Sequence, residues 1–245
     1  MPKLFVVSDI HSFYDKLIET LKNAEFDENN KDHWLVCCGD YFDRGDKPLE
    51  VLNYLTGLKR KILIRGNHED LLMDCLKRKR GLEHDFHNGT IKTINDFAPN
   101  ATSFEDACEI TEKLVQDFIN STVNYFETEN YVYVHGWIPN REDWREASNA
   151  DWDEACWSNG IKEAIEGNTI EKNIICGHYH TSWGHALKNK NNDEWGKNAD
   201  FSPYYSEGII AIDACTVVSN TMNMLVLEDE FISIPFIEKE LINCI

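Results

Sequence analysis

The chain has 245 residues, with 24 Lys and Arg against 43 Asp and Glu, which gives a formal net charge of -19. This balance disfavours duplex DNA, RNA and anionic membranes as partners, because affinity for phosphate groups in such partners depends on an excess of Lys and Arg. The 42% of apolar residues suffice for a buried core, which excludes a disordered acidic chain.

The first third of the chain alternates short apolar runs with helical patterns. The apolar runs, typical of strands buried on both faces, lie at 4–7, 34–38 and 62–64. Apolar residues recur at helical spacing over 14–21 and 51–58, and Pro48 suits the first turn of the second helix. We therefore predict a βαβαβα order, with parallel strands and crossover helices, in an α/β fold.

The stretch from 71 to 130 is predicted to be helical and free of strands. Ser103 and Asp106 resemble a capping box at the start of one of its helices. This region could form a lid over a site or only a packing layer of helices. Further strands are predicted at 131–134, 174–176, 209–212, 224–227 and 231–234. No Pro/Gly/Ser linker interrupts the chain, so we expect a single domain over 1–245.

Polar side chains follow each of the first five strands. They are Asp9 and His11, then Asp40, Asp43 and Arg44, then Asn67 and His68, then His135, and finally His178 and His180. Ligands of open α/β sheets bind at the carboxyl ends of the strands, so these residues are expected to converge in space.

The residue types at these strand ends are those of a dinuclear metal centre. Carboxylate, imidazole and carboxamide ligands suit Mn²⁺, Fe or Zn²⁺ better than Ca²⁺, and the lack of Cys ligands argues against a structural zinc. Each motif alone has an ordinary explanation, such as a helix N-cap with a surface histidine, or a turn with a solvated ion pair. Five such motifs in succession favour a metal site.

The motifs D-x-H, G-D-x-x-D-R-G, R-G-N-H-E, H-G and G-H-x-H follow one another in this order. The sequence resembles the calcineurin-like metallophosphoesterase superfamily, and within it the bacterial and phage type of the phosphoprotein phosphatase branch. The resemblance extends from Asp9 to about Asp213 and is weak in the helical middle. It implies a four-layer α/β/β/α sandwich with a helical insertion over roughly 71–130.

The resemblance also implies a role for each residue at the strand ends. The first metal ion would be held by Asp9, His11, Asp40 and His180, and the second by Asp40, Asn67, His135 and His178. His68 would protonate the leaving group, oriented by Asp43, and Arg44 would clamp phosphate oxygens bidentately. The cofactors would be two divalent or trivalent ions of Mn, Fe or Zn.

Two departures from the family pattern concern the substrate. Ser8 and Ser12 stand where the first motif usually has glycines. A second phosphate-binding arginine, expected between the fourth and fifth motifs, is absent near Trp157. Arg141 and Arg145 could replace it, and each could equally be a solvated surface residue.

The implied function is hydrolysis of a phosphoester by a metal-bridging hydroxide. The first interpretation is a serine/threonine phosphatase-like phosphomonoesterase acting on a phosphoprotein or a small phosphoester. The alternative is a dinucleoside tetraphosphate hydrolase or another nucleotide phosphoesterase, and a second alternative is an inactive metal-binding scaffold. Aromatic residues near the motifs could stack on a base or pack in the core: Phe13, Tyr41, Trp137, Tyr179 and Trp183.

The eight cysteines show no C-x-x-C motif and no regular spacing. A disulfide framework is not expected in a chain of this length. The N-terminal residues turn acidic after a short apolar run, unlike a signal peptide, and no apolar run reaches membrane-spanning length. We therefore expect a reduced, cytoplasmic protein.

Overall fold

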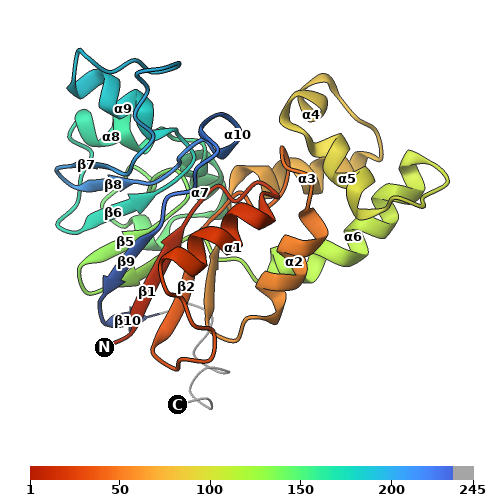
Figure 1. Ribbon diagram of the computed structural model, residues 1–245, viewed down its shortest axis with the longest axis horizontal. Coiled ribbons are helices and arrows are strands. Elements are labelled where there is room, and N and C mark those ends of the chain that lie inside the picture. The colour runs from red at the N-terminus through yellow and green to blue at the C-terminus, as the bar shows by residue number, and fades with distance from the viewer. Residues whose placement is uncertain (234–245) are drawn as a thin grey trace.

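The computed structural model describes residues 1–233 (Figure 1). Its strands are β1 (Lys3–Val7), β2 (His33–Cys38), β3 (Lys61–Ile64), β4 (Phe126–Thr128), β5 (Tyr131–Tyr133), β6 (Asn173–Cys176), β7 (Tyr204–Ser206), β8 (Ile209–Ala211), β9 (Leu225–Glu228) and β10 (Phe231–Ser233). All eight predicted strands are present, although Ile234, the last residue of the final prediction, lies outside the described residues. The prediction missed β4 and β7.

The helices alternate with the strands in the first third, as predicted, and gather in two later groups. They are α1 (Tyr14–Asn23), α2 (Pro48–Gly57), α3 (Asn67–Arg78), α4 (Glu83–Asn88), α5 (Thr90–Phe97), α6 (Phe104–Asn120), α7 (Asn149–Cys156), α8 (Gly160–Ile165), α9 (Thr181–Lys188) and α10 (Thr216–Ser219). None of the helices in residues 1–233 is long and apolar enough to cross a membrane.

The first sheet has the strand order β3-β2-β1-β9, with β1, β2 and β3 parallel and β9 antiparallel. Successive side chains of a strand point to opposite faces. Phe5 and Val7 of β1 therefore pack in the core beneath α1 and α2, whereas Leu4 and Val6 pack between the two sheets. Both faces of this sheet are buried, which explains the uninterrupted apolar runs in the sequence.

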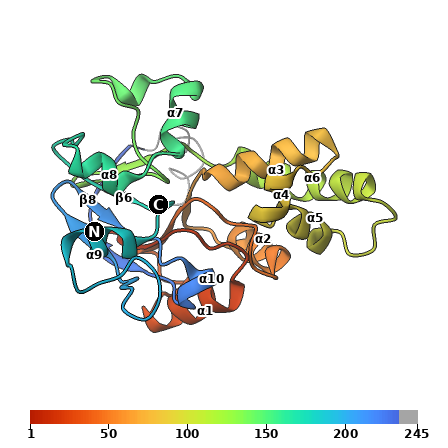
Figure 2. The same cartoon turned by 90° about the horizontal axis from the view of Figure 1, so that it is seen from above.

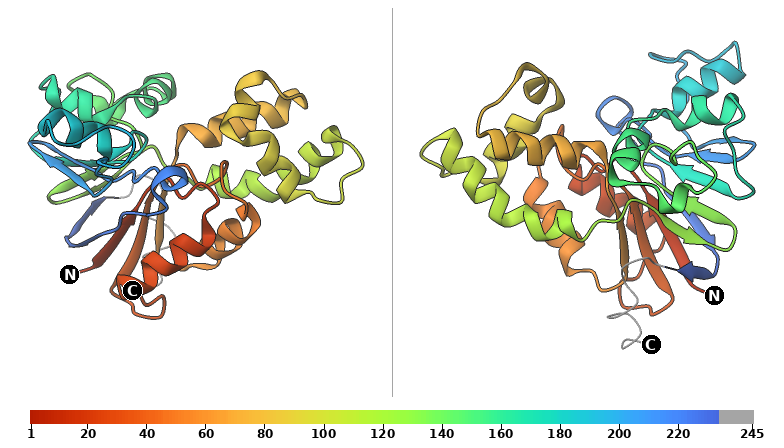
Figure 3. Two further views of the ribbon diagram at one scale, coloured as in Figure 1. Left: turned by 45° about the horizontal axis from the view of Figure 1, so that its top comes forward. Right: turned by 180° about the vertical axis from the view of Figure 1, so that it is seen from behind.

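The second sheet has the order β10-β4-β5-β6-β8-β7, with β5, β6 and β8 parallel. Ile175 of β6 faces the first sheet, and its neighbours Ile174 and Cys176 face the core that includes residues of α7 and α8. The layers therefore run helix, sheet, sheet, helix, which confirms the predicted α/β/β/α sandwich; Figures 2 and 3 show the two sheets from further directions.

Helices α3 to α6 project to one side of the sandwich (Figure 1). Half of the capping box predicted for α6 is present: Ser103 Oγ accepts the backbone N–H of Asp106 at 3.1 Å, whereas the Asp106 carboxylate accepts the backbone N–H of Thr102 at 2.8 Å. The prediction that 71–130 lacks strands is wrong at its end, where β4 spans Phe126–Thr128. A strand of three residues, whose buried Glu127 binds Arg145 and Lys172, has too short an apolar pattern to be recognised.

Candidate metal centre

The predicted site residues occupy one edge of the two sheets, at the carboxyl ends of β1, β2, β3, β5 and β6. Asp9, His11, Asp40, Asn67 and His135 are each 2% exposed, so their polar atoms are removed from water. Several of these residues leave their strands in a left-handed backbone conformation, with φ of 52° at Asp9, 47° at His11 and 58° at Asp40. This sharp turn brings side chains from separate strands together.

Glu69 fixes the loops that carry the candidate ligands. Its buried carboxylate accepts the backbone N–H groups of Asp40 at 3.0 Å, Tyr41 at 3.0 Å and Gly66 at 2.9 Å. Gly66 is required beside it, because a Cβ there would collide with the side chain and backbone of Asp40. Glu69 closes the R-G-N-H-E motif, and no role is predicted for it from the sequence; the structure makes it a positioning residue.

His135, Asn67 and His178 bring three nitrogen and oxygen atoms into close contact. His135 Nε2 lies 2.8 Å from Asn67 Oδ1, and His178 Nδ1 lies 3.0 Å from Asn67 Oδ1 and 3.2 Å from His135 Nε2. The Nδ1 proton of His135 is donated to the carbonyl of Cys38 at 2.8 Å, so its Nε2 presents a lone pair. At most one proton, on His178 Nδ1, is shared among these three atoms, so lone pairs face one another in an arrangement that a cation would satisfy.

The neighbouring group contains His11 and the carboxylates of Asp9 and Asp40. His11 donates Nδ1–H to the carbonyl of Phe42 at 2.8 Å, and its buried Nε2 has no hydrogen-bond partner. That Nε2 lies 3.5 Å from Asp40 Oδ2 and 3.9 Å from Asp9 Oδ1. An orphaned imidazole lone pair beside two carboxylates fits a metal ion, and the donor types fit Mn, Fe or Zn.

Asp40 is common to both groups. Its Oδ1 lies 3.4 Å from His135 Nε2 and its Oδ2 lies 3.5 Å from His11 Nε2. In the described residues, ligand atoms that could hold an ion converge as His11, Asp40 and His68, and as Asp40, His135 and His178. The two oxygens of Asp40 thus face different histidines, as a bridging carboxylate requires.

The structure does not bring His180 together with the other candidate ligands of the first ion. Its Nε2 lies 3.0 Å from Glu194 Oε1, and its ring lies between Tyr179, at 4.7 Å, and Trp195, at 4.2 Å between centroids. Sequence alone carries no signal for this orientation, because Glu194 belongs to a polar loop that lacks periodicity.

His68, Asp43 and Arg44 form a chain of contacts beside Asp40. His68 Nδ1 lies 2.7 Å from Asp43 Oδ2, which also accepts the hydroxyl of Thr90 at 2.8 Å. His68 Nε2 lies 3.2 Å from an exposed Arg44 guanidinium nitrogen and 3.8 Å from Asp40 Oδ2. Thr90 comes from α5, so the helical segment supports this chain directly.

Burial and mutual charge shift the pKa values in this edge in opposite directions. Burial, then Asp213 and Asp40, raise the pKa of Asp9 well above its usual range. Burial opposes ionisation of Asp40 as well, but four surrounding histidines outweigh it and lower its pKa. Burial and the neighbouring His135 lower the pKa of His178 to about 4, which keeps its imidazole neutral and able to bind a cation.

Asp213 is a further buried acid at this edge, which the sequence prediction did not include. It is 4% exposed and follows β8, the strand next to β6, and its Oδ1 accepts the backbone N–H of Cys215 at 2.6 Å. Burial raises its pKa. The sequence pattern that points to Asp213 is the same as for the other strands, since the apolar run at 209–212 is followed directly by this acid.

The two arginines considered as phosphate ligands are paired elsewhere. Arg141 binds Asp143 at 2.5 Å, and Arg145 binds both carboxylate oxygens of Glu127 while its guanidinium lies 4.2 Å from the Trp144 ring. Among the aromatic residues considered for base stacking, Tyr41 and Trp137 are core residues at 0% and 2% exposure.

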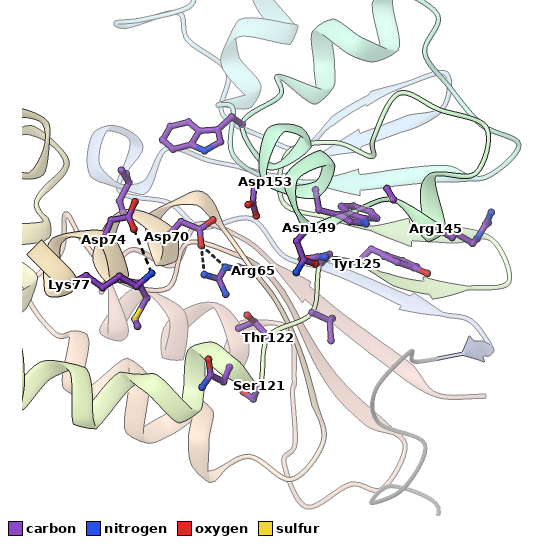
Figure 4. Close-up of a pocket in the computed structure, with 18 residues that line it drawn as sticks. Arg65, Asp70, Asp74, Lys77, Ser121, Thr122, Tyr125, Arg145, Asn149 and Asp153 are labelled. Carbon is purple, nitrogen blue, oxygen red and sulfur yellow. Dashed lines mark hydrogen bonds and ion pairs between the residues drawn. The ribbon is translucent and has the colours of Figure 1, made fainter.

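A groove of about 1240 Å³ opens between α3 and α7 beside this edge (Figure 4). Arg65, Asp70, Asp74 and Lys77 line one wall, and Asn149 and Asp153 lie on the opposite side. A narrow extension shares Arg65, Asp70, Trp152 and Asp153 with the groove and reaches His135. The groove therefore adjoins the candidate ligands.

A family model described as calcineurin-like phosphoesterase matches residues 2–200. The chain is 40% identical over 67 residues to a symmetrical bis(5'-nucleosyl)-tetraphosphatase of Nitrosococcus oceani and 39% identical over 66 residues to that of Klebsiella pneumoniae. These matches cover 27% and 26% of this chain and only 23% of each relative.

Solved structures of similar fold include a cold-active protein-tyrosine phosphatase of Shewanella, with a TM-score of 0.55 and 19% identity over 93% of this chain and 76% of the other. A putative diadenosine tetraphosphatase gives a TM-score of 0.54 and 14% identity over 95% of this chain and 97% of the other. At these identities the similarity establishes the fold.

Proposed function

Because the chain belongs to the calcineurin-like phosphoesterase family and is a metal-dependent phosphoesterase, we propose that it hydrolyses dinucleoside tetraphosphates. The observation that supports the catalytic part of this proposal is the buried cluster of Asn67, His135 and His178, whose acceptor atoms lie within 3.2 Å of each other. The identity to symmetrical bis(5'-nucleosyl)-tetraphosphatases supports the substrate. It favours the nucleotide alternative over the phosphoprotein interpretation.

Two metal ions would occupy this edge, one held by Asp9, His11 and Asp40, with His180 if it turns inward, and one held by Asp40, Asn67, His135 and His178. When bound, such ions lower the pKa of water toward neutrality and neutralise phosphate oxygens. Asp40 would belong to both ligand sets, consistent with the different histidines that its two oxygens face.

The remaining residues act on the phosphate chain. Water adds to one of the two central phosphorus atoms, the bond from that phosphorus to the central bridging oxygen breaks, and two nucleoside diphosphates leave. The exposed Arg44 guanidinium binds the phosphate oxygens as a planar fork. His68, held by Asp43 at 2.7 Å, delivers a proton to the departing oxygen.

A turnover panel tests this function. The Mn²⁺-loaded protein is assayed with diadenosine tetraphosphate, a phosphoserine peptide and an aryl phosphate, and His68→Gln serves as the inactive control. We expect kcat/KM to be at least about tenfold higher for the dinucleotide, and kcat of His68→Gln to fall by about 10²-fold or more. A preference for the phosphopeptide would restore the phosphoprotein interpretation, and no turnover of any phosphoester would leave only the metal-binding scaffold.

A further inference from the structure

Two exposed tryptophans flank the pair of histidines after β6. Trp157 is 51% exposed and its ring centroid lies 6.1 Å from that of His178. Trp195 is 48% exposed and its ring centroid lies 4.2 Å from that of His180. They come from separate segments, the end of α7 and the loop after α9. Trp157 therefore adjoins a histidine of the assembled cluster, and Trp195 adjoins His180, which follows the same strand.

Trp195 belongs to a continuous series of aromatic contacts, which Phe201 extends at 6.3 Å between ring centroids. Trp183 meets Tyr179 edge to face at 5.5 Å, Tyr179 stacks on His180 at 4.7 Å, and His180 meets Trp195. Ser182 donates its hydroxyl to the carbonyl of Glu194 at 2.7 Å, which fixes the loop that carries Trp195. The series holds the indole in place and leaves about half of it open to solvent.

Trp157 lines the groove between α3 and α7, and the cationic side chains of that groove are already paired with acids. Arg65 binds Asp70, Lys77 lies 3.8 Å from Asp74, and Arg145 at the far end binds Glu127. With its cations neutralised and Asp153 also in the lining, the groove offers little attraction to phosphate. Its aromatic and amide groups, such as Trp157 and Asn149, suit a neutral heterocycle and sugar.

We propose that Trp157 and Trp195 are stacking platforms for the two bases of the dinucleotide, one beside His178 and one beside His180. This inference rests on the proposed function and adds its specificity determinants. A substrate with a base at each end needs two platforms, whereas a phosphoserine or an aryl phosphate needs none. The phosphate chain would lie between the platforms, against Arg44 and the metal ligands.

The experiment compares Trp157→Ala and Trp195→Ala with the conservative Trp157→Phe and Trp195→Phe. Stacking of a base on an aromatic side chain contributes about 1–3 kcal/mol. We therefore expect each alanine variant to raise KM for diadenosine tetraphosphate by about tenfold to a hundredfold, with kcat nearly unchanged. The phenylalanine variants should retain most of the affinity. Tyr205→Ala is the matched control, because Tyr205 is 54% exposed on the edge strand β7.

Inorganic tetraphosphate provides the substrate without bases. Its KM should be the same in all variants, and an equal loss for both substrates would mean that the tryptophans only support the fold, which overturns the inference. Wild-type KM for the dinucleotide in both alanine variants would overturn it as well.

The proposed function and the stacking role of the two tryptophans can be tested separately. If the wild type hydrolyses an aryl phosphate but not the dinucleotide, the proposed function is wrong, and ADP is then used as a competitive inhibitor of aryl phosphate hydrolysis. A weaker inhibition by ADP in the alanine variants would support the platforms, and unchanged inhibition would overturn them.

Discussion

The two halves of the candidate metal centre differ in how completely the protein assembles them. The half made by Asn67, His135 and His178 has its donor atoms within 3.2 Å of one another, from three separate loops. In the half made by Asp9 and His11, His11 Nε2 lies 3.9 Å from Asp9 Oδ1, and His180 is held by Glu194. One half is preorganised by the fold, and the other needs a side chain to turn.

The largest expected effect comes from the residue that both halves share. Replacing Asp40 by Asn removes the charge that faces four histidines, and we expect both metal ions and all turnover to be lost together. Metal analysis after gel filtration measures this directly. Retention of one equivalent would show that the two halves bind independently and that Asp40 does not bridge them.

The next effect separates the halves. Asn67→Ala removes the central oxygen of the preorganised half, so bound metal should fall from two equivalents to one. His180→Ala removes a side chain that lies outside the cluster, and should weaken the other ion by only about tenfold. Equal losses in the two variants, measured by metal titration, would contradict the difference between the halves.

The proton donor gives a pH-dependent effect of intermediate size. Burial disfavours protonated His68, but Asp40 and Asp43 outweigh it and raise the pKa of His68 above its usual value. Activity that needs the protonated form is thus kept to higher pH and lost as pH rises through this pKa. Asp43→Asn removes one of these negative charges, so the alkaline limb of the profile of kcat against pH should move to lower pH. If the alkaline limb stays at the same pH, His68 is not the proton donor.

The smallest effect on the centre concerns the contact that holds His180. Glu194→Ala frees Nε2 of His180, and we expect the ion beside Asp9 and His11 to bind up to about tenfold more tightly. The control is Glu207→Ala, an exposed acid between β7 and β8. Weaker binding in the Glu194 variant would identify Glu194 itself as a ligand.

The sequence was sufficient for most of the sandwich and for the place of the centre. Strands buried on both faces leave unmistakable apolar runs, and the polar residues directly after them mark a shared edge. The same rule applied to 209–212 would have found Asp213. Short strands such as β4 escaped because three residues do not define a period.

Side-chain directions could not be predicted in this way. The contact of His180 with Glu194 joins residues fourteen positions apart through a loop without periodicity. Exposure of Trp157 and Trp195 depends on which face of the packed structure they occupy, so the aromatic residues chosen from sequence included Tyr41 and Trp137, which are core residues. Likewise, the pairing of Arg145 with Glu127, eighteen positions away, is set by a tertiary contact.

The left-handed turns at the strand ends have a consequence for thermal stability. In residues 1–233, seven of the eleven non-glycine residues with positive φ lie at this edge: Asp9, His11, Ser12, Asp40, Asp43, Arg44 and His178. Each such residue lowers the free energy of unfolding by on the order of 1 kcal/mol. The combined cost is comparable to the net stability of an ordinary domain.

Ser12 is the one residue of this set with no proposed chemical role, and its buried hydroxyl has no hydrogen-bond partner. Its φ of 59° is one that glycine adopts without strain. Ser12→Gly should therefore raise the melting temperature, measured by calorimetry, by about 2–4 °C. A lower melting temperature would contradict the inference that the backbone at Ser12 is strained. The edge that carries the candidate metal centre is thus where heat resistance can be gained without repacking the core.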